Sequence, residues 1–594
     1  GKGSKKIKKD DFYDEVDFMG ANISVNTSGA FAQSLTRYFP RALQMMADAA
    51  INPNFTEEEF VKERDLLIDG LKSSEKDVTT AARRVESLLA YGVDHPYGEY
   101  VTPGTVNNIK LEDTKRFYEF RFRPNNAYLV IVGDIDLNTV KPLVKKYFGK
   151  WKSSPVASSP LPKVVNPPTT QIDFVNMPNA VQSEVVVQST TYLTKKDPDY
   201  FPVLMANSIL GGGGEARLFL NLREDKGYTY GSYSSIGNNK RTATRFRATA
   251  SVRNEVTDSA VVELLSEIKR IRTDLVTASE LKKAKAKYVG SFVRSLENPA
   301  TIAQFALEIA TEGLDDNYYK NYLDRINAVT AEDVRRVAQK YFNVDQARVV
   351  ITGKGIDVLD NLEKVQFNGA YLPVNYYNKY GISIERPQKI AVGNGVTSKS
   401  VLENFIEKTG VNNSSDANAL QLTYKGTFMQ MSIEVEETYS AKEQKQVVSV
   451  GGNAVMTSVV SDASAFMKQG PNQMDLPKAI HDDLKKTLGM LPEIGFLNSD
   501  EATLEGIENI NGSDAYVIKV LGVGVSYTYY YSVETGLRVR ESSMTNFNGQ
   551  MQTNTTDYSD YTEQSGMLLA GKKSFNLGGQ DISLTLDKAT IITK

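Results

Sequence analysis

The residue types that most often carry enzyme chemistry are scarce in this sequence. It has no cysteine, and its only two histidines, His95 and His481, lie far apart along the chain. The lack of cysteine excludes thiolate metal sites, disulfides and a cysteine nucleophile. Two distant histidines do not form the closely spaced His ligands of a catalytic zinc site. Any metal-dependent activity would therefore need ligands from elsewhere.

A run of glycines from Gly211 to Gly214 is a further candidate for binding. No Gly-Lys-Ser/Thr follows it, so a phosphate-binding P-loop is excluded. Glycine lets a backbone approach a ligand closely, but glycines also end helices. At Gly211, Gly212 and Gly213 the sequence leaves both interpretations open, a binding loop and a helix-ending turn.

Length and charge limit the elements that could position such residues. A chain of 594 residues is too long for one hydrophobic core and is enough for about three or four domains. The formal net charge of −3 predicts no nucleic-acid partner. No stretch approaches the roughly 20 apolar residues that span a bilayer, and the basic run Lys2–Lys9 is typical of a solvated tail.

Part of the sequence returns after 220 positions. The segment Leu111–Phe117, followed by Phe122 and an apolar run that ends at Gly133, matches the segment Ala331–Val337, followed by Phe342 and an apolar run that ends at Gly353 (331 − 111 = 220). Both copies predict an amphipathic helix, a turn and a short strand ending in glycine. This order indicates one supersecondary unit used twice.

A second match lies upstream at nearly the same offset. Thr56 precedes Glu59, and Thr277 precedes Glu280, by the three positions of a capping box at a helix start. Residues 1–152 and 171–355 are therefore interpreted as two tandem α/β domains. The first lacks its opening strand and helix, and we expect its natural start to lie upstream. Residues 153–170, rich in Ser and Pro, are predicted to be a linker.

Together these segments resemble the pitrilysin/insulinase-type zinc metallopeptidases, whose subunits are built from two such repeats. The resemblance covers roughly residues 10–355. The segments that carry it are Gly20–Ser24, Asn52–Phe55, Glu63-Arg64, His95–Gly98, Arg123–Asn126, Val130–Asp134, Ile209–Gly213, Arg217–Phe219, and Leu222–Glu224 with Gly227 and Tyr230.

The resemblance implies an inverted zinc motif, His-x-x-Glu-His, on a helix that would lie upstream of Gly1. In catalytic members a third ligand, a Glu, follows seven positions after the Glu of the Glu-Arg pair. Here that position is Gly70, which has no side chain to bind a metal. Asp69 and Glu75 are poor substitutes, because one residue turns a helical side chain by about 100°. His95 is interpreted as a structural turn residue, and we expect no cofactor in this chain.

The second repeat of such subunits supplies an Arg and a Tyr, seven positions apart, that hold the substrate backbone. Arg223 and Tyr230 match that spacing, whereas Tyr228 does not. A guanidinium can hold a peptide carbonyl, and a phenol can stabilise an oxyanion. The alternative is a surface charge and a strand aromatic. The resemblance also implies that the loop of Gly211, Gly212 and Gly213 borders the substrate chamber.

After Gly353 the composition changes. Residues 356–396 are predicted to be an irregular connector, and residues 397–594 a helix followed by an antiparallel sheet, with Thr535-Gly536 and Asn548-Gly549 as hairpin turns. This last part resembles outer-membrane lipoprotein-carrier domains, in which a half-open barrel encloses an apolar cavity. Tyr527, Tyr529 and Tyr531 share one strand face, which either packs the sheet or lines a lipid-binding wall.

The predicted fold class is α+β: two tandem pitrilysin-type α/β repeats, the first incomplete at its N-terminus, and then an antiparallel half-barrel sheet with helices. The predicted function is the substrate-binding, non-catalytic subunit of a zinc metallopeptidase pair that acts on peptides, with zinc in a homologous partner subunit. The alternatives are a periplasmic lipid- or lipoprotein-binding scaffold and a self-sufficient zinc endopeptidase. Both resemblances imply a periplasmic or outer-membrane-associated protein of a Gram-negative envelope, reached through a signal peptide absent from this sequence.

Overall fold

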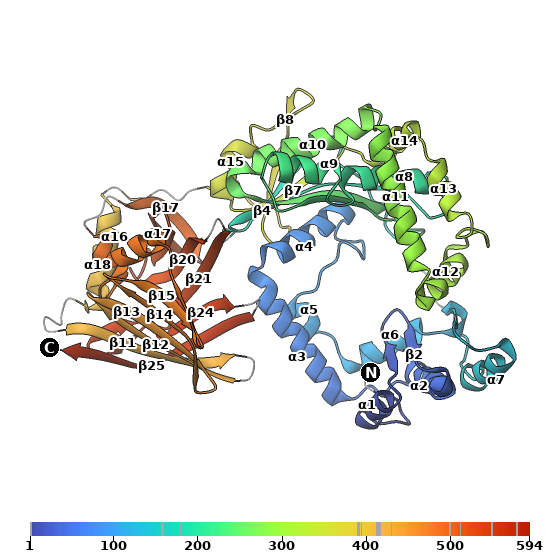
Figure 1. The fold of residues 1–594 in the computed structure, drawn as a ribbon, viewed down its shortest axis with the longest axis horizontal. Coiled ribbons are helices and arrows are strands. Elements are labelled where there is room, and N and C mark those ends of the chain that lie inside the picture. The colour runs from blue at the N-terminus through green and yellow to red at the C-terminus, as the bar shows by residue number, and fades with distance from the viewer. Residues whose placement is uncertain are drawn as a thin grey trace. The chain divides into compact units, whose positions relative to one another are not determined.

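The computed structural model divides the chain into two compact units, Gly1–Pro387 and Gln388–Lys594. Each unit is described by itself (Figure 1). The residues that the structure describes are 3–155, 160–178, 180–388, 392–393, 395–411, 417–428, 431–497, 501–510, 512–547, 550–577 and 580–593.

A six-stranded sheet forms the centre of the first unit, with the strand order β10-β3-β7-β4-β6-β5. The pairs β10–β3 and β3–β7 are parallel, and the other three pairs are antiparallel. The strands are β3 (Gln171–Asn176), β4 (Gln182–Thr191), β5 (Ser232–Ile236), β6 (Thr244–Arg253), β7 (Arg348–Gly353) and β10 (Val374–Tyr377).

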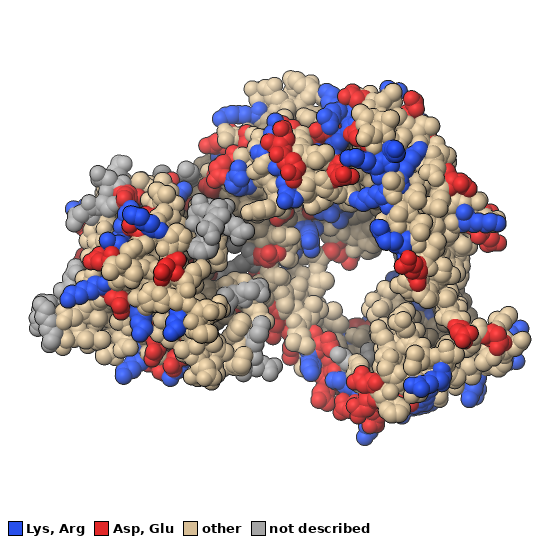
Figure 2. Space-filling view, in the orientation of Figure 1, with Lys and Arg blue, Asp and Glu red and all other residues tan. Residues whose placement is uncertain are grey.

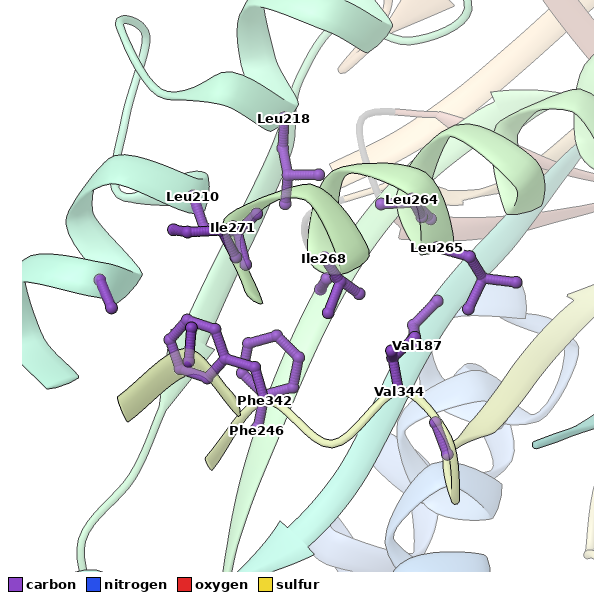
Figure 3. Packing of buried hydrophobic residues seen from close by; sticks show 14 of the residues in the cluster. Val187, Leu210, Leu218, Phe246, Leu264, Leu265, Ile268, Ile271, Phe342 and Val344 are labelled. Atoms are coloured by element: carbon purple, nitrogen blue, oxygen red, sulfur yellow. The ribbon is translucent and has the colours of Figure 1, made fainter. Parts of the chain in front are cut away.

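Helices cover one face of this sheet and form the main core. Three of them are α8 (Tyr200–Gly211), α10 (Thr257–Thr273) and α14 (Ala331–Tyr341). Figure 3 shows α10 placing Leu264, Ile268 and Ile271 over Val187 and Phe246 of the sheet. The apolar residues of α10 recur every three or four positions, so one stripe of the helix is buried. This core confirms a helix-and-sheet fold for the region.

The opposite face of the sheet is covered by α4 (Val78–Tyr91), which lies on the other side from α10 in Figure 1. Val85 of α4 packs against Val175 of β3 and Val350 of β7. Because β7 is covered on both faces, its residues 349–353 are all buried. Such a strand reads as a continuous apolar run rather than an alternating one.

The N-terminal part of the unit contains a two-stranded sheet and several helices. The match at residues 111 and 331 corresponds to α6 and α14, which both exist as predicted. The elements are α1 (Lys9–Phe18), β1 (Asn22–Val25), β2 (Ala30–Gln33), α2 (Phe39–Ile51), α3 (Glu57–Ser73), α5 (Pro103–Asn107), α6 (Leu111–Arg121) and α7 (Leu137–Phe148).

The strand predicted to end at Gly133 is not found. Residues 127–132 carry no strand assignment, and among the described residues no strand pairs with them. The matching run in β7 has β3 and β4 on either side. Since a strand depends on ladder hydrogen bonds to a neighbour, the same sequence pattern gives a strand only where partners are present.

The prediction of irregular structure for residues 356–396 is wrong in three places, one of them the hairpin of β8 (Gln366–Phe367) and β9 (Ala370–Tyr371). Residues 355–362 form α15, and β10 extends the sheet by pairing in parallel with β3. Tyr376 of β10 donates a hydrogen bond to Glu363 at 2.6 Å, which fixes this strand to the end of α15. The remaining elements are α9 (Arg217–Phe219), the π-helical turn η4 (Leu220–Asp225), α11 (Ala278–Ser295), α12 (Pro299–Glu312), α13 (Tyr322–Ala328), α15 (Gly355–Leu362), β8 (Gln366–Phe367) and β9 (Ala370–Tyr371).

The second unit is built on one antiparallel sheet with the order β16-β15-β14-β13-β12-β11-β25-β24-β21-β20-β19-β18-β17. This confirms the predicted antiparallel sheet. The strands are β11 (Ala417–Phe428), β12 (Met431–Ser440), β13 (Glu443–Val450), β14 (Asn453–Ser461), β15 (Ala465–Gln469), β16 (Asn472–Asp475), β17 (Ala502–Ile510), β18 (Ser513–Val520), β19 (Val525–Ser532), β20 (Arg538–Phe547), β21 (Gln550–Ser559), β24 (Lys572–Leu577) and β25 (Gln580–Thr593), with a separate hairpin of β22 (Thr562–Gln564) and β23 (Met567–Leu569).

Short helices pack on this sheet. They are α16 (Ser398–Thr409), α17 (Lys478–Leu484) and α18 (Pro492–Phe496). Phe405 of α16 lies against Tyr531 of β19, with ring centroids 5.2 Å apart. The predicted turn at Thr535-Gly536 joins β19 to β20, where Gly536 has φ +73°. Asn548-Gly549 lies outside the described residues.

Acidic and basic side chains are interspersed on the face shown in Figure 2, in agreement with the small net charge. Of the helices in the described part of the chain, none is both long and apolar enough to cross a membrane.

Candidate functional site

Arg223 and Tyr230 lie on one short connection between α8 and the edge strand β5. Arg223 belongs to η4, a single π-helical turn in which the Lys226 N–H donates to the Asn221 carbonyl at 2.9 Å. Single π-turns are uncommon and occur often at functional sites. Leu222, on the same turn, is fully buried in the main core, so the turn is anchored while its other side faces outward.

Both predicted substrate-binding side chains are accessible. The Arg223 guanidinium carbon lies 4.8 Å from the centroid of the Phe219 ring, and its Nε lies 3.5 Å from a Glu224 oxygen. The Arg223 side chain remains 47% exposed, and Tyr230 is 80% exposed. Tyr230 precedes β5, so it is not a strand residue. Tyr228 instead packs against the core, in keeping with its exclusion from the pair.

An open sheet edge follows this connection directly. β5 is the last strand in the sheet order, and it pairs with β6 on one side only. No other described strand hydrogen-bonds to its outer edge. A free edge offers backbone N–H and C=O groups that an extended peptide can pair with. Arg223 and Tyr230 therefore flank a surface that is suited to an extended chain.

A buried ion pair anchors the start of the connection between α8 and β5. Arg217 of α9 donates to both carboxylate oxygens of Glu280 at 2.6 and 3.2 Å, and its side chain is only 8% exposed. Burial opposes ionisation of Glu280, but hydrogen bonds from Arg217 and Thr277 outweigh it and lower its pKa to about 2. In the sequence Arg217 stands out only as part of the motif Arg217–Phe219, and Glu280 only as part of the predicted capping box with Thr277; neither signal indicates that the two side chains pair.

Close packing explains why glycine occupies positions 211–213. A Cβ on Gly211 would lie 2.1 Å from the Ser234 backbone nitrogen, so the end of α8 passes directly over β5. The Gly212 carbonyl accepts a hydrogen bond from Lys287. A Cβ on Gly213 would meet the Lys287 ammonium. These contacts favour the helix-ending interpretation, and a substrate-binding role of the three glycines stays a prediction.

The predicted third zinc-ligand position is Gly70 on α3. A Cβ added there would meet nothing within 4 Å. The nearby Glu75 is occupied, since Lys379 lies 3.1 Å from it and the Tyr380 hydroxyl donates to it. Among the described residues, no group of three or more His, Cys, Asp or Glu is arranged to hold a metal ion.

His95 is a structural residue, as predicted. It is fully buried, its ring stacks on Tyr91 with centroids 5.0 Å apart, and Nδ1 accepts the Tyr97 N–H at 3.0 Å. Nε2 therefore carries the proton and donates to the Thr242 hydroxyl at 3.0 Å. Burial lowers the pKa of His95. Both ring nitrogens are used, so neither is available to a metal.

The second unit contains a cavity of about 630 Å³. Its wall includes Tyr527 and Tyr529, whose rings stack with centroids 5.6 Å apart. Tyr531 is buried in the adjoining core and donates to Glu493 at 2.8 Å. The three tyrosines thus both pack the sheet and, at two positions, line a cavity. The volume is within the usual range of ligand pockets, about 300–1,000 Å³.

A helix-covered mixed sheet with an accessible Arg/Tyr pair before its edge strand, and a glycine at the predicted ligand position, are the features to compare with known peptidases. Residues 108–288 match the family described as the peptidase M16 inactive domain. A Bacillus subtilis protein described as the uncharacterized zinc protease YmxG is 23% identical over 364 residues, which cover 60% of this chain and 86% of the relative. Subunit beta of the mitochondrial-processing peptidase of Mus musculus is 25% identical over 372 residues, covering 59% and 74%.

A solved structure shows the same fold. The peptidase M16 inactive domain from Pseudomonas fluorescens superposes with a TM-score of 0.55 at 20% identity, covering 60% of this chain and 86% of that one. Residues 108–288 are therefore similar to the peptidase M16 inactive domain, and the first 60% or so of the chain is similar in sequence to proteins named as zinc proteases of the pitrilysin/insulinase type. The family match ends at residue 288, so the resemblance of the second unit to lipoprotein carriers stays a prediction.

Proposed function

We propose that this chain is the substrate-binding, non-catalytic subunit of a zinc metallopeptidase pair that acts on peptides in the cell envelope. One observation carries the proposal: Gly70 stands on α3 at the predicted ligand position, while Arg223 and Tyr230 are exposed on the connection that leads into the edge strand β5. The described residues thus include side chains suited to hold a peptide, whereas Gly70 offers no side chain to a metal.

A tandem arrangement of two repeats fits the helix order of the first unit. Helices α3, α4 and α6 begin at residues 57, 78 and 111, and α11, α12 and α14 begin at residues 278, 299 and 331. Each pair is separated by 220 or 221 positions. Thr277 and Glu280 form a complete capping box at α11, whereas at α3 only the Thr56 half is formed, because Lys9 binds Glu59 at 2.7 Å.

The partner is a homologous subunit that carries zinc, and the substrate is a peptide. The similarity to a named subunit of the mitochondrial-processing peptidase supports a paired assembly. In this pair Arg223 would hold a substrate carbonyl, and Tyr230 would donate to the oxyanion that forms at the scissile carbonyl, while the zinc of the partner would supply the activated water. The envelope location rests on the predicted lipoprotein-carrier resemblance of the second unit.

The test uses this chain mixed with a zinc-bearing homologue from the same cell, with cleavage of a fluorogenic peptide as the readout. Arg223→Ala and Tyr230→Phe are each expected to lower turnover about 100-fold, the usual cost of losing one transition-state donor. Arg116→Ala, on the exposed face of α6, is the control and leaves turnover unchanged. Undiminished turnover with both variants would refute the assignment.

Zinc content separates this proposal from a self-sufficient endopeptidase. The chain expressed from its natural start is expected to bind no zinc at micromolar free metal, as measured by elemental analysis. One zinc per chain, together with cleavage in the absence of any partner, would establish the alternative.

A second function is favoured by the cavity in the second unit. A volume of about 630 Å³ whose wall includes Leu422, Ile433 and Phe575 is suited to an acyl chain. We propose that this unit binds a lipid or the lipid part of a lipoprotein. Acyl chains that co-purify with the full chain, detected by mass spectrometry after extraction, are the expected result. A protein that neither co-purifies with lipid nor takes up added lipid would refute it.

A further inference from the structure

The cavity of the second unit has two chemically different parts. One part is apolar and includes Leu422, Ile433, Val435, Val448, Phe575 and Leu584. The other is a charged belt, defined here as Glu437 of β12, Arg538 and Glu541 of β20, Tyr558 of β21 and Lys573 of β24, all of which line the cavity. An acyl chain alone gives no reason for charges here, because burying a charge is costly unless it is paired.

One half of the charged belt is internally satisfied. Lys573 lies 2.6 Å from Glu437, and both side chains are nearly buried. Glu437 also accepts the Tyr439 hydroxyl at 3.0 Å and the Gln446 amide at 3.2 Å. Burial opposes ionisation of Glu437, but the Lys573 charge and these hydrogen bonds outweigh it and lower its pKa. This half has little capacity left for a ligand.

The other half has an unused donor. Arg538 contacts Glu493 at 3.0 Å and Glu541 at 3.4 Å, in both cases through Nη1. Its Nε and Nη2 have no hydrogen-bond partner among the described residues; protein atoms cover Nε completely, whereas Nη2 is not fully covered. The guanidinium carbon lies 4.6 Å from the centroid of the Tyr558 ring, which holds it in place against the sheet. Because Arg538 lines the cavity, Nη2 is the donor that a ligand in the cavity can reach.

The charges around Arg538 limit what that acceptor can be. Three carboxylates, Glu437, Glu493 and Glu541, surround two cations, Arg538 and Lys573. A carboxylate or phosphate head group would add a further negative charge next to Glu541 in a poorly solvated site, where like charges repel strongly. An uncharged acceptor, such as an ester or amide carbonyl, can accept a hydrogen bond from Nη2 without that repulsion. An N–H or O–H on the same head group can donate to Glu541.

We infer that the cavity binds a neutral amphiphile, in which an acyl chain lies along the apolar part and an uncharged ester or amide head group accepts a hydrogen bond from Arg538. This inference rests on the proposed lipid-binding function of the second unit and adds the identity of the head group. The ester and the amide represent two sources, an acylglycerol and an acylated amine, which share this chemistry.

The test measures binding of three probes of one chain length to the full chain: a monoacylglycerol, an N-acyl glycinamide and the fatty acid, by calorimetry at pH 8. The wild-type protein is expected to bind at least one neutral probe about tenfold or more tightly than the fatty acid. Whichever neutral probe binds more tightly identifies the source. If the fatty acid binds as tightly as both neutral probes, the head-group inference is overturned while lipid binding stands. If no probe binds, both the inference and the lipid-binding function fail.

Two variants connect this preference to the charged belt. Glu541→Gln removes the surplus carboxylate and is expected to raise the affinity for the fatty acid about tenfold, a gain that misfolding cannot produce. Arg538→Met is expected to weaken neutral probes about tenfold. The control is Arg540→Met, a buried arginine on the same strand that pairs with Asp557 at 2.6 Å and does not line the cavity. An unchanged preference in Glu541→Gln, with circular dichroism confirming the fold, overturns the inference.

Discussion

Replacement of Glu280 by glutamine should destabilise the first unit in a pH-dependent way. The carboxylate accepts two hydrogen bonds from the buried Arg217 and one from the Thr277 N–H at 2.8 Å, so Glu280→Gln leaves a buried guanidinium without its counter-charge. The pKa of Glu280 falls from 4.5 to about 2. At about 1.4 kcal/mol per unit this corresponds to roughly 3 kcal/mol. Because Glu280 is 29% exposed, solvent screening reduces the expected loss to about 2 kcal/mol.

The sign of the pH dependence follows from the lowered pKa. A carboxylate whose pKa is lower in the folded state stabilises the protein above its unfolded pKa, and this stabilisation is lost as the pH falls toward the folded pKa. The difference between wild type and Glu280→Gln should therefore be complete at pH 7 and shrink from pH 4.5 downward. Urea unfolding at several pH values, followed by fluorescence of Trp151 and by circular dichroism, measures it.

A matched control isolates the ion pair. Glu332 lies in the first turn of α14 and is exposed, so Glu332→Gln changes a helix-terminal charge without breaking a buried pair. Its expected effect is within about 0.5 kcal/mol. Equal losses for Glu280→Gln and Glu332→Gln, or a loss for Glu280→Gln that does not vary with pH, would refute the argument. Since Arg217 precedes η4, Glu280→Gln should also reduce the Arg223-dependent turnover of the subunit pair.

Two glycine substitutions should change the free energy of unfolding in opposite directions, as measured by thermal unfolding. Gly211→Ala is expected to lower it by about 2 kcal/mol or more, because the new Cβ would overlap the Ser234 backbone. Gly70→Ala lies in a helix with nothing near the new Cβ, so it should raise it by about 1 kcal/mol. Equal effects would show that the close approach of α8 to β5 is absent. His95 should titrate below its ordinary pKa of 6.5, since burial lowers it. It therefore stabilises the fold above pH 6.5, and that stabilisation declines as the pH falls. With only two histidines in the chain, ring proton resonances can test this directly.

The helices of the first unit were predictable because their signals are local. The capping box at Thr277 and the apolar stripe of α14 each lie within one turn or two of helix. The strand predicted before Gly133 was wrong, because an apolar run forms a strand only where a neighbouring strand pairs with it. In the second unit β15 and β16 have no comparable local signal. They are short and mostly exposed strands at the sheet edge, with no alternating apolar pattern to reveal them.

The candidate sites also differ in whether their residues are close together in the sequence. Arg223 and Tyr230 lie seven residues apart on one connection, so the family resemblance could indicate both from one local motif, and both proved accessible. Arg217 and Glu280 are 63 positions apart, and Glu437 and Lys573 are 136 apart. No sequence spacing indicates such pairs, because they meet only through sheet and helix packing. The charged belt of the second unit was therefore invisible in the sequence, where only the tyrosines of β19 suggested a wall.

The two proposed functions are assigned to different units of the chain. Cutting the chain between Pro387 and Gln388 tests whether each unit performs its function alone. The main core of the first unit and that of the second share no residue, so each fragment keeps its own buried apolar cluster. We expect residues 1–387 to retain Arg223-dependent turnover with the zinc-bearing partner, and residues 388–594 to retain amphiphile binding. Cooperative unfolding of each fragment, followed by circular dichroism, is the control for folding. If the folded first fragment loses turnover that is restored by adding the second fragment, peptide binding depends on both units. The simple assignment of peptide binding to the edge of β5 would then be wrong.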